Sequence, residues 1–513
     1  MEETALKKSF KTIWLVASFF ILGAILRAYQ LSTKSIWCDE AFSILLARNP
    51  ISKIFNYLFH SSNQKFFGTP VYCHDTTHAL LLKLWSIFGS DIFAARLLSA
   101  VFGALSIFMI YQVARLLADK KTSLISALLV TISPFYIQFS QTARMYTLTL
   151  FFGTASIFFF LKILKGSGKF NWNWPGYIFT TTLNIYLHPF GVIMLLIQNL
   201  YILIQRRKIT KSTKKWLISQ GFVGIFIVPY LILWLRQMII HSGGLYLETP
   251  SFKLPFISLA AFFYNLALGN LSPSGESLII IIFTIVAYGA CFTLGTAFFY
   301  KEKTEPLFLY FWLFIPIALI MPLGFKSLSF GGARQLIQFT PPFYILVAYG
   351  LTKIEIKSSK IFAVLLVVFI TISILSLINW YKIDDNYGLR EGAQLIKDRP
   401  QKNDFVLHTN GCSMLPIVYY LNSAQNQYLF DTNNIEIDNK LAENTTKEAW
   451  LFTYQLTSKR KSFVEDQVEE NKLNKEQEKF FFNKGFNLSR RISFPSNNPV
   501  EIYLFERINC EQN

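Results

Sequence analysis

The chain is poor in charged residues: Asp, Glu, Lys and Arg make up only 16% of its 513 residues. Soluble domains usually carry about a quarter charged residues, so this scarcity excludes an ordinary soluble protein. Hydrophobic residues account for 52% of the chain and aromatic residues for 17%, with 51 phenylalanines among them. The composition therefore predicts an α-helical polytopic membrane protein.

Cysteine is also scarce, and the five cysteines show no metal-ligand spacing. Cys38 and Cys73 flank the first loop, while Cys412 and Cys510 lie near the C-terminus. In an oxidising compartment, Cys38–Cys73 and Cys412–Cys510 disulfides are conceivable, but free thiols are the simpler expectation because sequence gives no distances. We predict no metal and no cofactor, although acidic residues and histidines outside the membrane leave a divalent metal open.

Two further features are missing. No small-residue cleavage site follows the first apolar run, which Lys7, Lys8 and Lys11 precede. We therefore expect an uncleaved first span and not a signal peptide. The chain also has no internal repeat and no low-complexity linker, and repeat symmetry is frequent in transporters.

Long apolar runs predict about eleven membrane spans. They lie near residues 12–31, 93–117, 122–139, 145–164, 174–188, 189–205, 216–236, 277–299, 306–323, 335–352 and 360–380. Arg27 stands near the end of the first span and is expected to snorkel outward. The apolar stretch 254–269 either crosses the membrane or dips into it.

Basic residues give the net charge of +18 and are concentrated in alternate loops between the spans. By the positive-inside rule these loops are cytoplasmic, which puts the first loop and everything after residue 380 outside. Because the charge lies in short juxtamembrane loops, it indicates anionic membrane lipids as partners and no nucleic acid.

The character of the sequence changes after the last span. Alternating apolar residues at 405–407, 427–430, 450–454 and 501–505 predict strands, and 389–397 and 462–482 predict helices. We expect a transmembrane domain at 1–380, which includes the first external loop 32–91, and an external α/β domain at 381–513.

Polar residues recur on the predicted outer side, close to the ends of the spans. They are Asp39, Glu40, His74, Asp75, Gln141, Arg144, Tyr146, His188 and Arg334. Ionisable groups beside a bilayer are costly in isolation, so a shared cavity is the economical explanation. The alternatives are a solvated acidic pair, headgroup-anchoring arginines and a histidine that hydrogen-bonds between helices.

Acids and arginines in one external cavity indicate a particular chemistry. A carboxylate can take the proton of a hydroxyl nucleophile, and arginines can stabilise a departing phosphate. The combination predicts group transfer from a lipid phosphate to an acceptor on the outer face.

Five segments carry a resemblance to a known family. They are Trp37–Phe42, with Asp-Glu at its centre; Leu80–Gly89; Ser133–Tyr146, which ends in Ala-Arg-Met-Tyr; Tyr186–His188; and Tyr387–Leu421. In this order they resemble the protein O-mannosyltransferase-like glycosyltransferases, polytopic enzymes of the type C fold, including bacterial members. The part of the first external loop just before Leu80 departs from the family pattern, because residues 74–79 lack the prolines and tyrosines that the family has there. Thr142 and Gln335 replace an acidic residue and a tyrosine.

The resemblance implies an inverting glycosyltransferase that uses a polyprenyl-phosphate sugar donor and a protein, lipid or glycan acceptor. Asp39 would be the general base, with Glu40 supporting it. Arg144, His188 and Arg334 would contact the donor phosphate. His74, Gln141 and Tyr146 are weaker candidates for substrate binding. The implied location is the bacterial inner membrane, with the active site facing outside.

Two other classes of function remain open. One is a transporter or flippase of lipid-linked glycans, which would be expected to show discontinuous spans, mid-membrane charges or repeats. The other is a structural assembly factor, which fits the α/β tail but leaves the acidic pair without a role.

Overall fold

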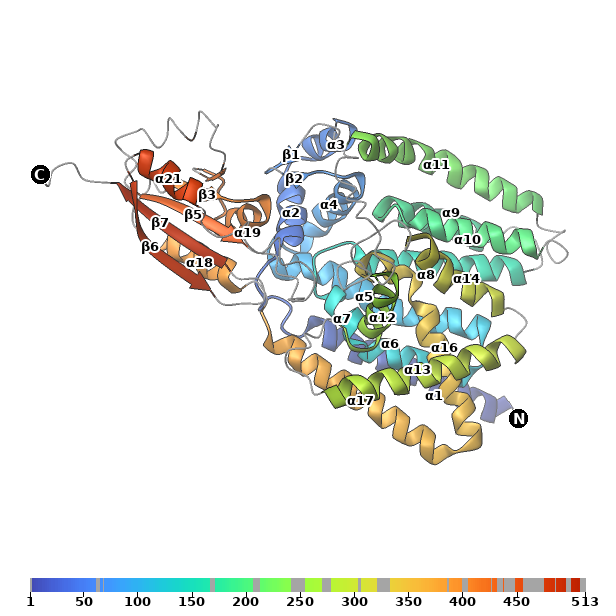
Figure 1. Cartoon of the computed structure of the whole chain (residues 1–513). Helices are drawn as coiled ribbons and strands as arrows, with labels where there is room; N and C mark the ends of the chain where they lie inside the picture. The colour runs from blue at the N-terminus through green and yellow to red at the C-terminus, as the bar shows by residue number, and fades with distance from the viewer. Residues whose placement is uncertain are drawn as a thin grey trace, which may run out of the picture. The chain divides into compact units, whose positions relative to one another are not determined.

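A computed structural model describes residues 2–60, 65–67, 69–166, 171–205, 213–240, 254–269, 278–302, 306–320, 333–384, 387–398, 405–425, 427–430, 437, 448–454, 475–484, 486–494 and 500–507. The chain divides into two units, residues 1–31 with 72–382 and residues 32–71 with 383–513 (Figure 1). Residues 32–71, which we assigned with the transmembrane domain, thus belong to the same unit as the C-terminal residues. The functional domain boundaries stay a prediction.

The first unit is helical. Its elements are α1 (Glu2–Ala28), α4 (Cys73–Trp85), η1 (Ser86–Phe88), α5 (Ile92–Leu117), α6 (Lys120–Ile132), α7 (Pro134–Ser140), α8 (Tyr146–Lys165), α9 (Asn173–Leu187), α10 (Gly191–Ile204), α11 (Thr213–Ile240), α12 (Leu254–Leu268), α13 (Leu278–Glu302), α14 (Pro306–Ile320), η6 (Arg334–Phe339), α16 (Pro341–Lys357) and α17 (Ser359–Lys382).

Six helices among the described residues are long and apolar enough to cross a membrane. They are residues 10–28 of α1, α5, α8, residues 214–237 of α11, residues 281–302 of α13, and α17. The bent pair α6 and α7 would make a seventh. The spans expected at 174–188, 189–205 and 306–323 correspond to the shorter helices α9, α10 and α14, and the one at 335–352 is divided between η6 and α16. The count of about eleven stays a prediction.

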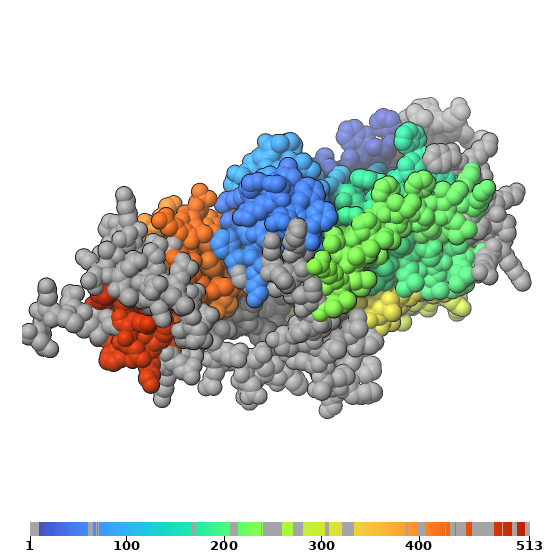
Figure 2. Space-filling model, turned by 90° about the horizontal axis from the view of Figure 1, so that it is seen from above, coloured from blue at the N-terminus to red at the C-terminus, as the bar shows by residue number. Residues whose placement is uncertain are grey.

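Apolar side chains remain exposed along several of these helices. On α11, Leu217, Phe222, Ile225 and Ile232 are exposed, and this helix covers part of the face seen in Figure 2, where it is green. Exposed apolar surface of this extent is unfavourable in water and favourable in lipid. The first unit is therefore a membrane-embedded helical body, as the composition predicts.

The path between α6 and α7 depends on a proline and on a buried arginine. Pro134 has no N–H, so the carbonyl oxygen of Val130 lacks its helical donor, and the two helices meet at 54°. Arg27 supplies the missing donors: its Nη2 donates to Val130 at 3.2 Å and its Nη1 to Thr131 at 3.2 Å. The Arg27 side chain is 0% exposed. The expected outward snorkelling is therefore wrong, because these carbonyls hold the guanidinium inside.

The second unit combines a mixed sheet with helices. Its elements are α2 (Cys38–Arg48), α3 (Ile51–His60), β1 (Lys65–Phe66), β2 (Thr69–Pro70), α18 (Tyr387–Lys397), β3 (Phe405–His408), α19 (Gly411–Leu421), β4 (Gln427–Leu429), β5 (Glu448–Tyr454), α21 (Lys475–Asn483), β6 (Phe486–Phe494) and β7 (Val500–Arg507). The five-stranded sheet has the order β4-β3-β5-β7-β6, with β4, β3 and β5 parallel and β7 and β6 antiparallel to their neighbours.

Alternation along the strands gives this sheet two apolar faces. One face carries Val406, Trp450 and Leu504 against α18 and α19, and the other carries Leu407 and Phe505 against α21 (Figure 1). The strands expected at 405–407, 427–430, 450–454 and 501–505 and the helix at 389–397 are confirmed. The helix expected at 462–482 is described only from Lys475 onward. The predicted fold class, a polytopic helical protein with a C-terminal α/β region, is confirmed.

Candidate active site

The acidic pair lies in the first turn of α2, in the second unit. The segment before it is fixed to C-terminal residues of the same unit. The backbone N–H and Oγ of Ser35 donate to Asp384 at 2.8 and 2.7 Å, and the N–H of Ile36 donates to the Tyr420 hydroxyl at 2.7 Å. A disulfide then joins Cys38 to Cys412 of α19, with the two Cα atoms 4.7 Å apart. The start of α2 is thus held immediately before Asp39.

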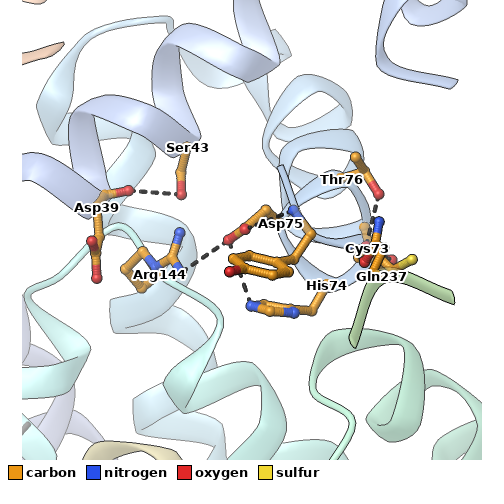
Figure 3. Close-up of polar contacts among 10 residues, drawn as sticks. Asp39, Ser43, Cys73, His74, Asp75, Thr76, Arg144 and Gln237 are labelled. Atoms are coloured by element: carbon orange, nitrogen blue, oxygen red, sulfur yellow. Dashed lines mark hydrogen bonds and ion pairs between the residues drawn. The ribbon is translucent and has the colours of Figure 1, made fainter. Parts of the chain in front are cut away.

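Asp39 and Glu40 lie in different surroundings. Consecutive residues of an α-helix point about 100° apart. Accordingly, Glu40 is only 1% exposed, whereas Asp39 is partly exposed. The backbone carbonyl of Asp39 accepts a hydrogen bond from the Ser43 hydroxyl at 3.0 Å (Figure 3). The two carboxylates are therefore not equivalent.

The disulfide corrects our expectation for the cysteines. Cys38 and Cys412 are neither free nor bonded as Cys38–Cys73 and Cys412–Cys510; they are bonded to each other. Cys73 is a buried free thiol, and Cys510 lies outside the described residues. The physical reason is that the second unit is built from two separate segments of the chain, residues 32–71 and 383–513. This brings the start of α2 next to α19, although Cys38 and Cys412 are 374 positions apart in the sequence.

A second group of polar side chains lies at the start of α4, in the first unit. The N–H of Cys73 donates to the side-chain oxygen of Gln237 on α11 at 3.1 Å, which fixes this helix end (Figure 3). Asp75 follows in the first turn, where its Oδ2 accepts from the N–H of Tyr72 at 3.3 Å. His74 stacks on the Tyr72 ring, with centroids 5.6 Å apart.

Arg144 reaches this group from the turn between α7 and α8. Its carbonyl accepts from the Ser99 hydroxyl of α5 at 3.0 Å, and Thr147 donates to the Ser99 carbonyl at 2.8 Å. The turn is therefore fixed on α5. The Arg144 side chain is 7% exposed and forms an ion pair with Asp75, with Nη2 and Oδ1 3.0 Å apart (Figure 3).

His188 and Arg334 complete the group. The rings of His74 and His188 have their centroids 5.6 Å apart. Arg334, at the start of η6, lies over the Tyr146 ring, 5.6 Å from its centroid. His188 also interacts electrostatically with His74, Arg144 and Arg334. We call His74, Asp75, Arg144, His188 and Arg334 the cationic cluster, since it contains two arginines and one carboxylate, together with two histidines.

The charges in this cluster act on two residues of α4. Burial raises the pKa of Asp75, but the charges of His74 and Arg144 outweigh burial and leave that pKa below its ordinary value. Burial, together with the charge of Arg144, lowers the pKa of His78 to about 3. Asp75 is therefore an anion and His78 a neutral imidazole at neutral pH. Neither ring nitrogen of His78 has a hydrogen-bond partner among the described residues.

Gln141 has a different environment. Its side-chain N–H₂ donates to the backbone carbonyls of Arg27 and Tyr29 at 3.2 and 2.7 Å, where α1 ends. Its side-chain oxygen accepts from the Trp380 indole at 2.7 Å. These contacts support a structural role for Gln141, and its predicted contact with substrate stays a prediction.

The structure thus brings five of the predicted residues together in the first unit: His74, Arg144, Tyr146, His188 and Arg334. Asp39 and Glu40 lie in the second unit. Asp75, the carboxylate of the cationic cluster, has no predicted role beyond being one of the polar residues near the span ends, and His78 is not among the predicted residues. The spacing of His74 and His78, one helical turn apart, was the available signal.

In the described part of the chain, no three His, Cys, Asp or Glu residues form a group that could hold a metal ion.

Comparison with known proteins gives one match to a family model. Residues 77–234 match the family described as dolichyl-phosphate-mannose-protein mannosyltransferase. The matched segment includes Arg144 and His188 and begins after Asp39. No curated protein matches the sequence.

Solved structures share the fold over most of the chain. The crystal structure of ArnT from Cupriavidus metallidurans in the apo state has a TM-score of 0.58 at 11% identity and covers 97% of this chain and 98% of ArnT. ArnT bound to undecaprenyl phosphate has a TM-score of 0.56 at 11% identity and covers 96% of this chain and 98% of ArnT. A third structure is the oligosaccharyltransferase AglB from Archaeoglobus fulgidus, in complex with an inhibitory peptide and a dolichol-phosphate. It has a TM-score of 0.56 at 12% identity and covers 86% of this chain and 69% of AglB.

At such identities these structures show a common fold, and the family match adds a segment of sequence. The expected resemblance and the expected enzyme class, a glycosyltransferase, are supported. Together with the apolar helices, the comparisons also support an integral membrane protein. The chain is similar to the dolichyl-phosphate-mannose-protein mannosyltransferases over residues 77–234 and has the type C glycosyltransferase fold.

Proposed function

We propose that this chain transfers a sugar from a polyprenyl-phosphate donor to an acceptor hydroxyl at the outer face of the membrane, with inversion at the anomeric carbon. The observation that carries the proposal is the cationic cluster around the buried Arg144. A site with two arginines and one carboxylate attracts an anion, and arginine binds phosphate oxygens through charge-assisted hydrogen bonds. The polyprenyl-phosphate bound to ArnT and the dolichol-phosphate bound to AglB support this class of donor.

Asp39 is the proposed general base. Its carboxylate takes the proton of the acceptor hydroxyl while the acceptor oxygen bonds to the anomeric carbon from the face opposite the phosphate. The bond between that carbon and the phosphate oxygen breaks, and polyprenyl phosphate leaves with the electron pair. Direct displacement of this kind inverts the anomeric centre. Ser35, Ile36 and the Cys38 disulfide hold the start of α2, which supports a fixed position for the base.

Glu40 and the cationic cluster have supporting roles. Glu40, almost fully buried, orients the first turn of α2 and does not replace Asp39 as base. Arg144, with His188 and Arg334, stabilises the negative charge that develops on the leaving phosphate. His74 and Tyr146 border these side chains and contribute to substrate binding.

We further propose that the protein lies in a bacterial inner membrane with α2 and the C-terminal unit outside. Lysines and arginines concentrate in the loops expected to be cytoplasmic. The Cys38–Cys412 disulfide agrees with this orientation, because disulfides persist mainly in oxidising compartments.

The proposal is tested by sugar transfer from polyprenyl-phosphate donors with the purified full chain. Asp39→Asn keeps the size of the side chain and removes its basicity, so transfer should fall by on the order of 10²–10⁴-fold. Glu40→Gln should lose less. Asp384→Ala, which removes the acceptor for Ser35 and leaves Asp39 intact, separates loss of the base from loosening of α2. Retained transfer in both Asp39→Asn and Glu40→Gln would refute the catalytic role of this turn.

Two other outcomes address the alternatives. Movement of a lipid-linked glycan across vesicle membranes, without transfer by the wild-type chain, would favour a flippase. A reporter fused after residue 425 that is active only in the cytoplasm would contradict the proposed orientation.

A further inference from the structure

The cationic cluster contains a carboxylate where the proposed function needs a phosphate. Asp75 Oδ1 lies 3.0 Å from Arg144 Nη2, and the two side chains are 6% and 7% exposed (Figure 3). The pair joins α4 to the turn between α7 and α8. Arg144 is the cation that we assign to the leaving phosphate, so its guanidinium already has an anionic partner.

Asp75 is also held by its own helix. Its second oxygen, Oδ2, accepts from the N–H of Tyr72, and Nε2 of His74 lies 3.8 Å from Oδ1. A carboxylate in the first turn is further stabilised by the helix dipole. If Arg144 turned to another anion, Asp75 would therefore keep partners and would not be left as an isolated buried charge.

Both lipid phosphates can compete for the guanidinium. The donor is a phosphodiester with two non-bridging oxygens and one charge, and the polyprenyl phosphate product is a monoester with up to two charges, whereas Asp75 offers one charge that is shared with Tyr72 and His74. We propose that Asp75 is a built-in counter-anion, which occupies Arg144 in the empty site, is displaced by the donor phosphate and regains Arg144 when the lipid phosphate product leaves.

This inference rests on the proposed function and deepens it. Competition from Asp75 weakens binding of every lipid phosphate, including the product, which retains the phosphate after the sugar has been transferred. Asp75 would thus be a positioning residue that limits product inhibition. Its removal should tighten binding of the lipid phosphate and slow its release.

Asp75→Asn is the informative variant, because the amide oxygen can still accept from Tyr72 while the charge is lost. Loss of one charged competitor should tighten phosphate binding by about tenfold, which corresponds to about 1.4 kcal/mol. Asp91→Asn is the matched control. Asp91 also accepts a backbone hydrogen bond at a helix start, from Ala94 at 2.9 Å, and it lies outside the cationic cluster.

The experiment titrates the full chain in detergent with undecaprenyl phosphate, and with undecaprenol as the uncharged probe. We expect tighter binding of the phosphate to Asp75→Asn, wild-type binding to Asp91→Asn, and loss of the preference for phosphate in Arg144→Ala. Unchanged or weaker binding to Asp75→Asn, while the wild type binds normally, would overturn the inference alone. Absence of phosphate-dependent binding to the wild type would overturn the proposed function as well.

Turnover separates this role from a structural one. In Asp75→Asn the KM for the donor and the kcat should both fall, because donor binds more tightly and product leaves more slowly. A folded variant with an unchanged KM would contradict the proposal. Asp75→Ser is the second variant, and if neither folds, Asp75 is a structural counterion and the proposal is wrong.

Discussion

Arg27 donates a hydrogen bond to the carbonyl oxygen of Val130, the carbonyl that Pro134 leaves without a helical donor. A side chain of α1 thus completes the end of α6, at the bend that leads to Arg144. A charged residue inside a membrane-embedded body is costly unless it is paired, and here two backbone carbonyls of α6 and one of α1 surround it. The charge therefore has a structural explanation.

Replacing Arg27 should destabilise the first unit. Arg27→Leu leaves the carbonyls of Val130 and Thr131 unsatisfied, at a cost of about 1–3 kcal/mol for each. We expect a clear fall in the thermal unfolding temperature of the full chain in detergent. Arg115→Leu is the control, since Arg115 is an exposed arginine in the last turn of α5. Equal effects of the two substitutions would show that the bonds to α6 contribute little.

The close approach of α13 and α16 makes a second prediction. A Cβ atom at Gly295 would lie 1.8 Å from the carbonyl oxygen of Leu346, and one at Gly350 would lie 1.9 Å from that of Cys291. Gly295→Ala and Gly350→Ala should each force the helices apart and lower stability by about 1–3 kcal/mol. Gly289→Ala, on the same helix with open space around it, should not. Thermal unfolding of the three variants is the measurement, and similar values for all three would refute the prediction.

Local patterns were sufficient for much of the fold. Long apolar runs identified α5, α8 and α17, and alternation identified β5 and β7, because burial of one face imposes a period on the sequence. β6 was missed since most of its residues are exposed and its pattern is weak. α19 was missed too, because Pro416 lies inside it and is followed there by two β-branched residues, Ile417 and Val418, which disfavour a helix.

Contacts between distant segments left no local signal. The Cys38–Cys412 pairing depends on two segments joining in one unit, and spacing does not encode that. Arg27 looked like a residue at a span end, since only the bend at Pro134 creates its acceptors. For the candidate site, residue type and predicted membrane side selected Arg144 and His188. The ion pair that gives Asp75 its importance required the structure.

The disulfide leads to a third prediction, on stability and activity together. Because it joins the two separate segments of the second unit, its loss should destabilise that unit by about 2–4 kcal/mol and loosen the start of α2. A dithiol reductant should lower the unfolding temperature and the rate of sugar transfer of the wild-type chain. The double variant Cys38→Ser, Cys412→Ser should show both losses without reductant. An equal response of this variant to the reductant would point to another target.

His408 makes the last prediction, on the pH dependence of the second unit. It lies on β3, is 0% exposed, and has its Nε2 3.1 Å from the side-chain oxygen of Gln427. Burial lowers the pKa of His408 to about 3, and the bond to Gln427 offsets this only in part. The unfolded chain, with an ordinary histidine pKa near 6.5, therefore binds a proton that the folded chain does not. Stability is complete above about pH 6.5 and is lost as the pH falls toward 3, by up to about 1.4 kcal/mol for each pH unit.

Hydrogen-exchange protection of β3 and β5, corrected for intrinsic rates and compared between pH 7.5 and pH 5, measures this loss. His408→Gln, which keeps a neutral group beside Gln427, should be less stable at pH 7.5 but should lose less protection between the two pH values. The same pH-dependent loss in wild type and variant would assign the effect to other groups.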